Sequence, residues 1–84
     1  MRTVDLVIER FPQLSTAVRQ LFLRDSEFRA ICEDFSLALE SLHRFEARPD
    51  APMRTEVDDY RNLVRELEEE LRRHIEADRK DLRR

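Results

Sequence analysis

The stretch VDDYRNLVRELEEELRRHI, residues 57–75, decides the fold because its apolar side chains recur at alternating spacings of three and four. That spacing places them along one side of an α-helix, and Leu63 and Ile75 widen the seam beyond a two-position coiled-coil stripe. The seam consists of Val57, Tyr60, Val64, Leu67, Leu71 and His74. The stretch therefore predicts a long amphipathic helix over about 55–78.

The start of this helix is marked by a capping signal. Thr55 and Asp58 have the spacing of a capping-box variant in which Asp replaces the usual Glu or Gln. A start at Asp50 or Ala51 is also compatible with the sequence. We therefore expect the first turn close to Thr55, with the start left open by a few residues.

The end of this helix is predicted at Asp78, which carries a charge where the seam calls for an apolar residue. An ionised carboxylate is costly to bury without a partner, so we expect the helix to leave the packed core there, despite a further Leu82. Residues 79–84 then form a frayed basic tail.

A second long helix is predicted over about 26–46, where Asp25 and Ser26 offer oxygens that cap its start. Its apolar seam consists of Phe28, Ile31, Phe35, Ala38, Leu42 and Phe45. An irregular stretch with two prolines, over 47–54, separates this helix from the last one.

The N-terminal segment, about 3–24, shows the same helical spacing but is interrupted by Pro12. The seam members are Val4, Val7, Phe11, Leu14, Val18 and Leu21. Proline biases the preceding residue away from helical geometry and fits the first turn of a helix, so Phe11 should end a short first helix and Pro12 begin a second.

These segments predict an all-α, single-domain protein. We expect an antiparallel hairpin of the two long amphipathic helices, with the shorter, Pro-broken N-terminal segment packed across it. Three amphipathic segments present more apolar surface than one hairpin covers, and small domains often gain stability from oligomerisation. We therefore expect a dimeric bundle.

Composition excludes several kinds of site. The sequence contains no glycine, and the usual phosphate-binding loops, dinucleotide fingerprints and nucleophile elbows all require glycine. A net charge of −3 gives no general attraction to nucleic acid or anionic membrane. Cys32 is the only cysteine, and no apolar run has the length of a membrane span. We expect a cytoplasmic protein without cofactor or metal.

Two histidines have carboxylates at metal-ligand spacing. Glu40 and His43 have the E-x-x-H spacing of di-iron bundles, but both fall on the side away from the Phe-rich seam. His74 lies in the last seam, with Glu70 and Asp78 four residues either side. We interpret Glu40 and His43 as a solvated pair. We interpret His74 as a histidine that forms a hydrogen bond with Glu70 or with a partner helix.

Three leucines fall off the seams of their own segments, on faces that are otherwise polar: Leu6, Leu23 and Leu37. Single exposed leucines are ordinary. If these three cluster in space, they form an apolar patch suited to a second subunit or another protein. They are our candidate interaction residues, whereas the candidate core seam is Phe28, Phe35, Leu42, Phe45, Tyr60, Val64, Leu67 and Leu71.

The segments ERFPQL (9–14), LFLRDSEFRAICEDF (21–35) and YRNLVRELEEEL (60–71), with Phe45–Glu46 between the last two, resemble the YdcH-like family of small bacterial proteins of unknown function. The resemblance is one of order and spacing and covers about three quarters of the chain. It implies a helical hairpin that self-associates in a bacterial cytoplasm, and it supplies no catalytic residue. An early histidine and a lysine-rich second helix are expected of that family. This sequence departs from that pattern, because it has Arg and Glu instead.

The function that the sequence favours is a non-enzymatic helical module for protein–protein interaction or regulation, with a protein partner of unknown identity. The alternative is a nucleic-acid accessory protein that uses its Arg-rich C-terminus, residues 79–84. Cations at a helix C-terminus also complement the helix dipole, so nucleic acid is the less expected partner. A metal-dependent enzyme built around His74 is the least favoured class.

Overall fold

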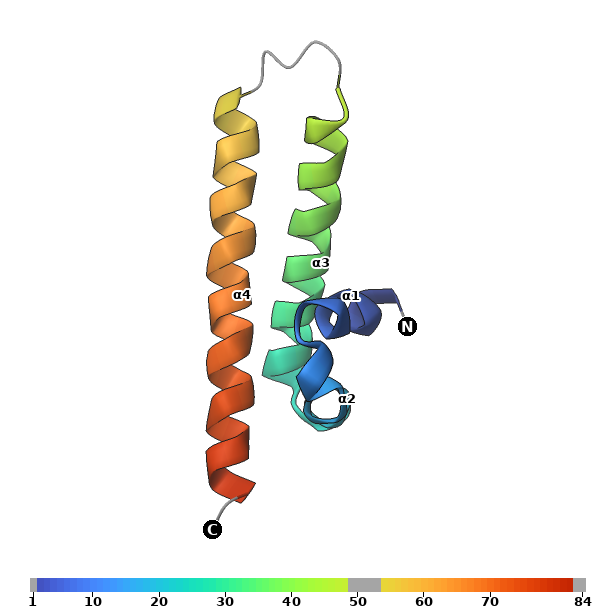
Figure 1. Cartoon of the computed structure of the whole chain (residues 1–84), viewed down its shortest axis with the longest axis vertical. Helices are drawn as coiled ribbons and strands as arrows, with labels where there is room; N and C mark the ends of the chain where they lie inside the picture. Colours follow the sequence, from blue (N-terminus) through green and yellow to red (C-terminus); the bar gives the residue numbers. More distant parts are fainter. Residues whose placement is uncertain (1, 49–53, 83–84) are drawn as a thin grey trace.

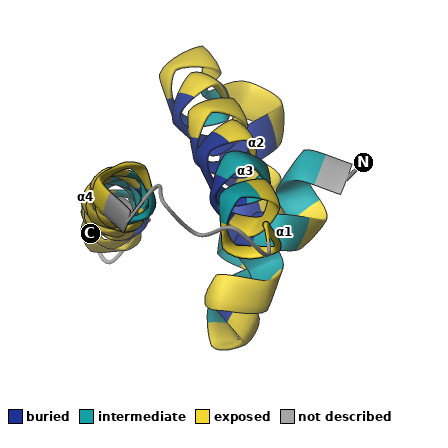
Figure 2. Cartoon of the chain, turned by 90° about the horizontal axis from the view of Figure 1, so that it is seen from above, coloured by how far each residue is buried: buried dark blue, intermediate teal, exposed yellow. Residues whose placement is uncertain are grey.

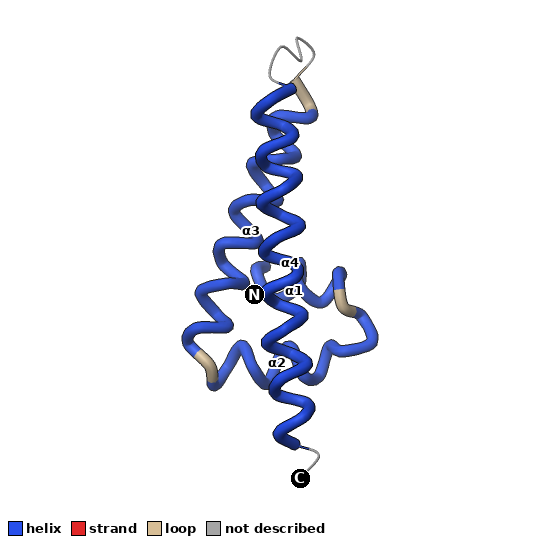
Figure 3. The backbone as a smooth tube through the Cα atoms, turned by 90° about the vertical axis from the view of Figure 1, so that its left-hand side faces the viewer, coloured by secondary structure: helices blue, strands red, loops and turns tan. Residues whose placement is uncertain are grey.

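The computed structural model describes residues 2–48 and 54–82, and all regular secondary structure in those ranges is helical. The elements are α1 (Arg2–Arg10), the short 3-10 helix η1 (Pro12–Leu14), α2 (Ser15–Arg24), α3 (Ser26–Glu46) and α4 (Arg54–Leu82). The molecule is elongated, with extents of 52 × 22 × 21 Å. From α1 to α3, helix follows helix through very short connections (Figure 3). The prediction of an all-α protein is confirmed.

Pro12 and Asp25 set the boundaries of the N-terminal helices as predicted. Helix α1 ends at Arg10, Phe11 adopts a non-helical backbone (φ −130°, ψ 62°), and Pro12 opens η1. Asp25 then caps α3, because its Oδ1 accepts hydrogen bonds from the backbone N–H groups of Glu27 (3.0 Å) and Phe28 (3.1 Å). These two features turn the chain twice within its first 26 residues.

The two long helices, α3 and α4, lie side by side (Figure 1). Late α3 meets early α4, since the ring of Phe45 stacks on that of Tyr60 with centroids 5.3 Å apart. Early α3 meets late α4, since the centroid of Phe28 lies 6.1 Å from that of His74. The helices therefore run in opposite directions. The segment that joins them, 49–53, lies outside the described residues, and with it most of the predicted irregular stretch 47–54.

Helices α1 and α2 pack beside the half of α3 nearest the C-terminus of α4 (Figure 1). The core lies where these helices meet, and buried residues concentrate there while the outward-facing turns are exposed (Figure 2). Its largest fully buried side chains are Phe28, Phe35, Leu71, Ile75, Val7, Val18 and Cys32. Each of the aliphatic and aromatic side chains in this set contributes about 1.5 to 3 kcal/mol of hydrophobic free energy.

The burial of the predicted core residues changes along the length of the α3–α4 pair. Phe28, Phe35, Leu42, Val64 and Leu71 are buried. Tyr60 and Leu67 are partly buried against the core, and Phe45 is half-buried. The half-buried aromatic pair lies toward the end that α1 and α2 do not reach (Figure 1). Burial is thus deepest where the N-terminal segment adds a further layer.

The predicted end of the last helix is wrong. Helix α4 continues to Leu82, past the boundary expected near residue 78 and into the segment predicted to fray. With 29 residues against 21 in α3, α4 is longer by roughly 12 Å at 1.5 Å per residue. Asp78 does not leave the packed part of the molecule, because the guanidinium of Arg24 in α2 pairs with its carboxylate.

Candidate functional site

His74, the first candidate ligand, contacts α3 rather than its neighbours on α4. Its Nε2 lies 3.4 Å from Oε1 of Glu27, and its ring is tilted by 51° against that of Phe28. The carboxylate of Asp78 is engaged by Arg24 instead. His74 thus contacts a partner helix, as one of the two sequence interpretations expected.

The second candidate pair, Glu40 and His43, lies on α3. The His43 side chain is exposed and that of Glu40 is half-buried. Within residues 2–48 and 54–82, no group of three or more His, Cys, Asp or Glu side chains is arranged to hold a metal ion.

Cys32 lies in the core, where its side chain is fully buried. Burial, and secondly the charge of Glu33, raises the pKa of the thiol to about 12. A thiol with a raised pKa stays protonated at neutral pH and is a poor nucleophile. Cys32 therefore acts as a small core residue.

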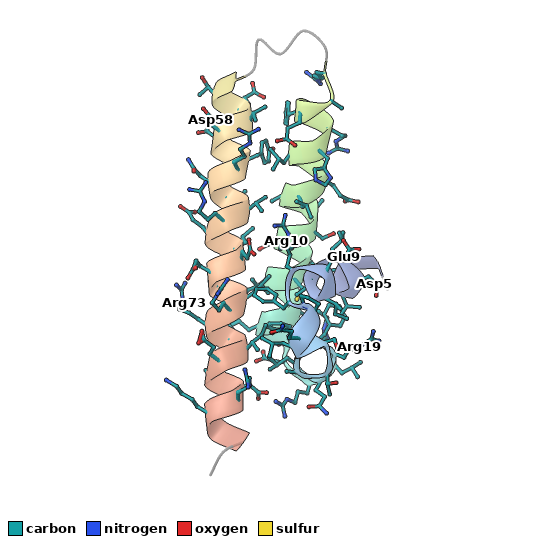
Figure 4. All side chains as sticks on the ribbon, in the orientation of Figure 1. Asp5, Glu9, Arg10, Arg19, Asp58 and Arg73 are labelled. Atoms are coloured by element: carbon teal, nitrogen blue, oxygen red, sulfur yellow. The ribbon has the colours of Figure 1, made fainter. Side chains whose placement is uncertain are left out.

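Cations from two helices contact aromatic rings in the core. The guanidinium of Arg10 lies 5.8 Å from the centroid of Phe35, and its Nη1 is 3.9 Å from Oε1 of Glu68. Figure 4 shows Arg10 reaching between the long helices. Arg72 of α4 lies 5.7 Å from the ring centroid of Phe11. These contacts attach the N-terminal segment to both long helices.

The three candidate interaction leucines do not form one exposed patch, which corrects that part of the prediction. Leu6 is partly buried and packs against the core, so it contributes to the protomer itself. Leu23 of α2 is 80% exposed and Leu37 of α3 is 62% exposed. The structure leaves these two available for contact with another molecule.

Leu63 is a further exposed leucine that the sequence assigned to the margin of a core seam. It is 40% exposed on α4. The broad seam predicted for this helix holds only where a second layer covers it, and toward the Phe45–Tyr60 end the two long helices have no such layer (Figure 1). Periodicity alone does not reveal which end of a helix pair is covered.

The remaining outer surface is charged. Asp58 and Arg73 point from α4 away from α3 (Figure 4). At the end where α4 begins, Arg61 Nη2 contacts Oε2 of Glu46 at 2.9 Å, and the Arg48 guanidinium lies 5.2 Å from the ring centroid of Phe45. An exposed ion pair such as Arg61–Glu46 contributes about 0.2 to 1 kcal/mol. The charged groups at this end of the helix pair therefore form a solvated polar surface.

None of the helices in the described part of the chain is long and apolar enough to cross a membrane. The chain matches no family model, no curated protein and no solved structure.

Proposed function

We propose that this protein is a non-enzymatic helical module for protein–protein interaction or regulation, built on a hairpin of α3 and α4 and self-associating as a dimer. The observation that carries the proposal is the exposure of two large apolar side chains, Leu23 and Leu37. Both lie on helices that otherwise bury their apolar residues well. An amphipathic helix binds a partner through a few apolar anchor residues set among charged ones.

Membership in the YdcH-like family is part of this proposal, as is the bacterial cytoplasmic setting that the resemblance implies. The structure bears on two of the quoted motifs. The Phe-Pro pair at 11–12 separates α1 from η1, and Asp25 caps the helix that contains Phe28 and Phe35. Both motifs define helix boundaries. This structural role supports a function that is carried out by the surfaces of the helices.

The experiment is affinity purification of the tagged protein from its native cell at natural abundance, with an untagged copy expressed beside it. We expect a specific protein to co-purify in stoichiometric amount, together with the untagged copy. A variant with Phe35→Ala, which removes a fully buried ring, is the control for capture by misfolded protein. Elemental analysis that finds one zinc or iron per chain would contradict the non-enzymatic assignment.

A second candidate function, nucleic-acid binding, is favoured by one observation on α4. Arg65, Arg72 and Arg79 follow each other at intervals of seven residues, all exposed, so they lie in a row along one side of the helix. Such a row continues the basic C-terminus predicted from the sequence. A phosphate-binding surface requires affinity that falls steeply with salt concentration. Titration with duplex DNA and with RNA at two salt concentrations tests it, and no binding at low salt would exclude it.

A further inference from the structure

The outward face of α3 carries a row of residues centred on Leu37. Ala30, Glu33, Leu37, Ser41 and Arg44 recur at intervals of three and four, so they lie on one side of the helix. Four of them are exposed and Ser41 is half-buried. The core residues of α3, such as Phe35 and Leu39, lie on other sides of the helix. We call this row the Leu37 stripe.

The two halves of the Leu37 stripe carry charges of opposite sign. On the stripe itself, the half before Leu37 carries Glu33 and the half after it carries Arg44, and two acidic residues, Asp34 and Glu40, flank the stripe three residues either side of Leu37. Arg48 extends the basic half just beyond the helix. Leu37 is the one large apolar residue of the stripe, and Ala30 and Ser41 are its small residues. A surface of this kind is complementary to itself when it is turned end for end.

We infer that the Leu37 stripe is the contact surface for a second copy of this chain, with the two α3 helices antiparallel across a two-fold axis at Leu37. This inference rests on the proposed function and names the surface through which self-association takes place. Leu37 of each protomer meets the other at the axis. Glu33 of one protomer faces Ser41 of its partner and lies within reach of the partner's Arg44.

Both charge and side-chain size favour the antiparallel arrangement. A parallel pair would set Glu33 against Glu33 and Arg44 against Arg44, and like charges at such positions are destabilising. In the antiparallel pair, Ala30 lies opposite the partner's Arg44, so the aliphatic stem of the arginine covers a small side chain. The contact should weaken as salt concentration rises, because the charged pairs are at the rim.

The first test compares Leu37→Asp with Leu23→Asp by sedimentation equilibrium of the full chain. Both leucines are exposed, but only Leu37 lies on the stripe. We expect Leu37→Asp to raise the dimer dissociation constant about tenfold or more, because it places two charges at the centre of the contact, and Leu23→Asp to leave it unchanged. Far-ultraviolet circular dichroism at low concentration should show the same helicity for both variants.

The second test concerns orientation and does not depend on Leu37. Glu33→Arg alone and Arg44→Glu alone should each weaken the dimer, and the two changes together in one chain should restore it. A parallel dimer would show no such rescue. Leu37→Cys in a Cys32→Ala background should also form an intermolecular disulfide on mild oxidation, whereas Leu23→Cys in that background should not.

The outcomes separate this inference from the proposed function. If the wild-type protein dimerises and Leu37→Asp has no more effect than Leu23→Asp, the stripe is not the interface, although self-association stands. If the wild-type protein is monomeric at all concentrations while a protein partner co-purifies, the inference fails and the interaction function stands. If the charge reversal gives no rescue, the antiparallel arrangement is wrong.

Discussion

The guanidinium of Arg24 at the end of α2 donates a hydrogen bond to the carboxylate of Asp78 near the end of α4, across 54 residues of sequence. The Asp78 side chain is 15% exposed and that of Arg24 is 52% exposed. The pair therefore joins the N-terminal segment to the C-terminal end of α4. Oδ2 of Asp78 is buried and has no hydrogen-bond partner among the described residues.

Replacing Asp78 by Asn should lower the free energy of unfolding by about 1 kcal/mol, because it removes a partly exposed ion pair. Urea denaturation followed by circular dichroism measures this loss. The matched control is Glu76→Gln, which removes an exposed carboxylate from the same part of the helix. Equal effects of the two changes would show that the pair with Arg24 does not stabilise the fold.

The contrast between Phe35 and Phe45 tests the placement of the core. Phe35→Ala should lower the free energy of unfolding by about 3 to 5 kcal/mol, because it empties a fully buried site. Phe45→Ala removes the same side chain from a half-buried position and should cost clearly less. Urea denaturation of both variants decides, and a larger loss at Phe45 would contradict the described core.

These residues also show how far the sequence determines the fold. Helix boundaries at Pro12 and Asp25 were predictable because proline geometry and capping act within a few residues. Asp78 was assigned wrongly because its stabilising partner lies in another helix, and nothing in local periodicity identifies such a partner. Leu6 and Leu63 were assigned wrongly for a related reason. Which part of a helix is covered depends on where α1 and α2 pack.

The candidate site was predictable only in part. Exposure at Leu23 and Leu37 follows from their positions off the apolar seams, which a helical periodicity detects. The charge pattern of the Leu37 stripe was in the sequence as well. The sequence alone does not show that this side of α3 is exposed. The structure shows it, because the other helices pack on different sides of α3.

Cys32 should be protected in the folded protein. Because burial raises the pKa of its thiol to about 12, alkylation by iodoacetamide at pH 8 should be slow in native protein and fast in denaturant. The unfolded thiol ionises near its ordinary pKa of 9.0, so the free energy of the unfolded state falls relative to that of the folded state as pH rises above that value. The stability that Cys32 adds is therefore complete below pH 9 and declines as pH rises toward 12.

The pH dependence is measured as the difference in melting temperature between the wild-type protein and Cys32→Ala. Wild type should be the more stable at pH 8, and its advantage should shrink at pH 11. Rapid alkylation of native protein, or a constant difference between the two pH values, would contradict the burial of this thiol.

Deletion of residues 79–84 should leave the fold intact. The side chains of Arg79 and Lys80 are exposed, and Asp78, which pairs with Arg24, is kept in the shortened chain. We expect the free energy of unfolding to fall by less than about 1 kcal/mol, chiefly through lost charge–dipole interaction at the helix end. Circular dichroism during thermal unfolding measures it. Loss of the helical signal in the truncated protein would show that this end of α4 is needed for packing.

The central claim is that the protein associates with itself through its helical surface. Sedimentation equilibrium of the wild-type chain, from low to high micromolar concentration at low salt, tests it most directly. We predict a reversible monomer–dimer equilibrium with the dimer dominant at the upper end and weakened by added salt. A well-folded monomer that persists to high micromolar concentration would contradict the claim.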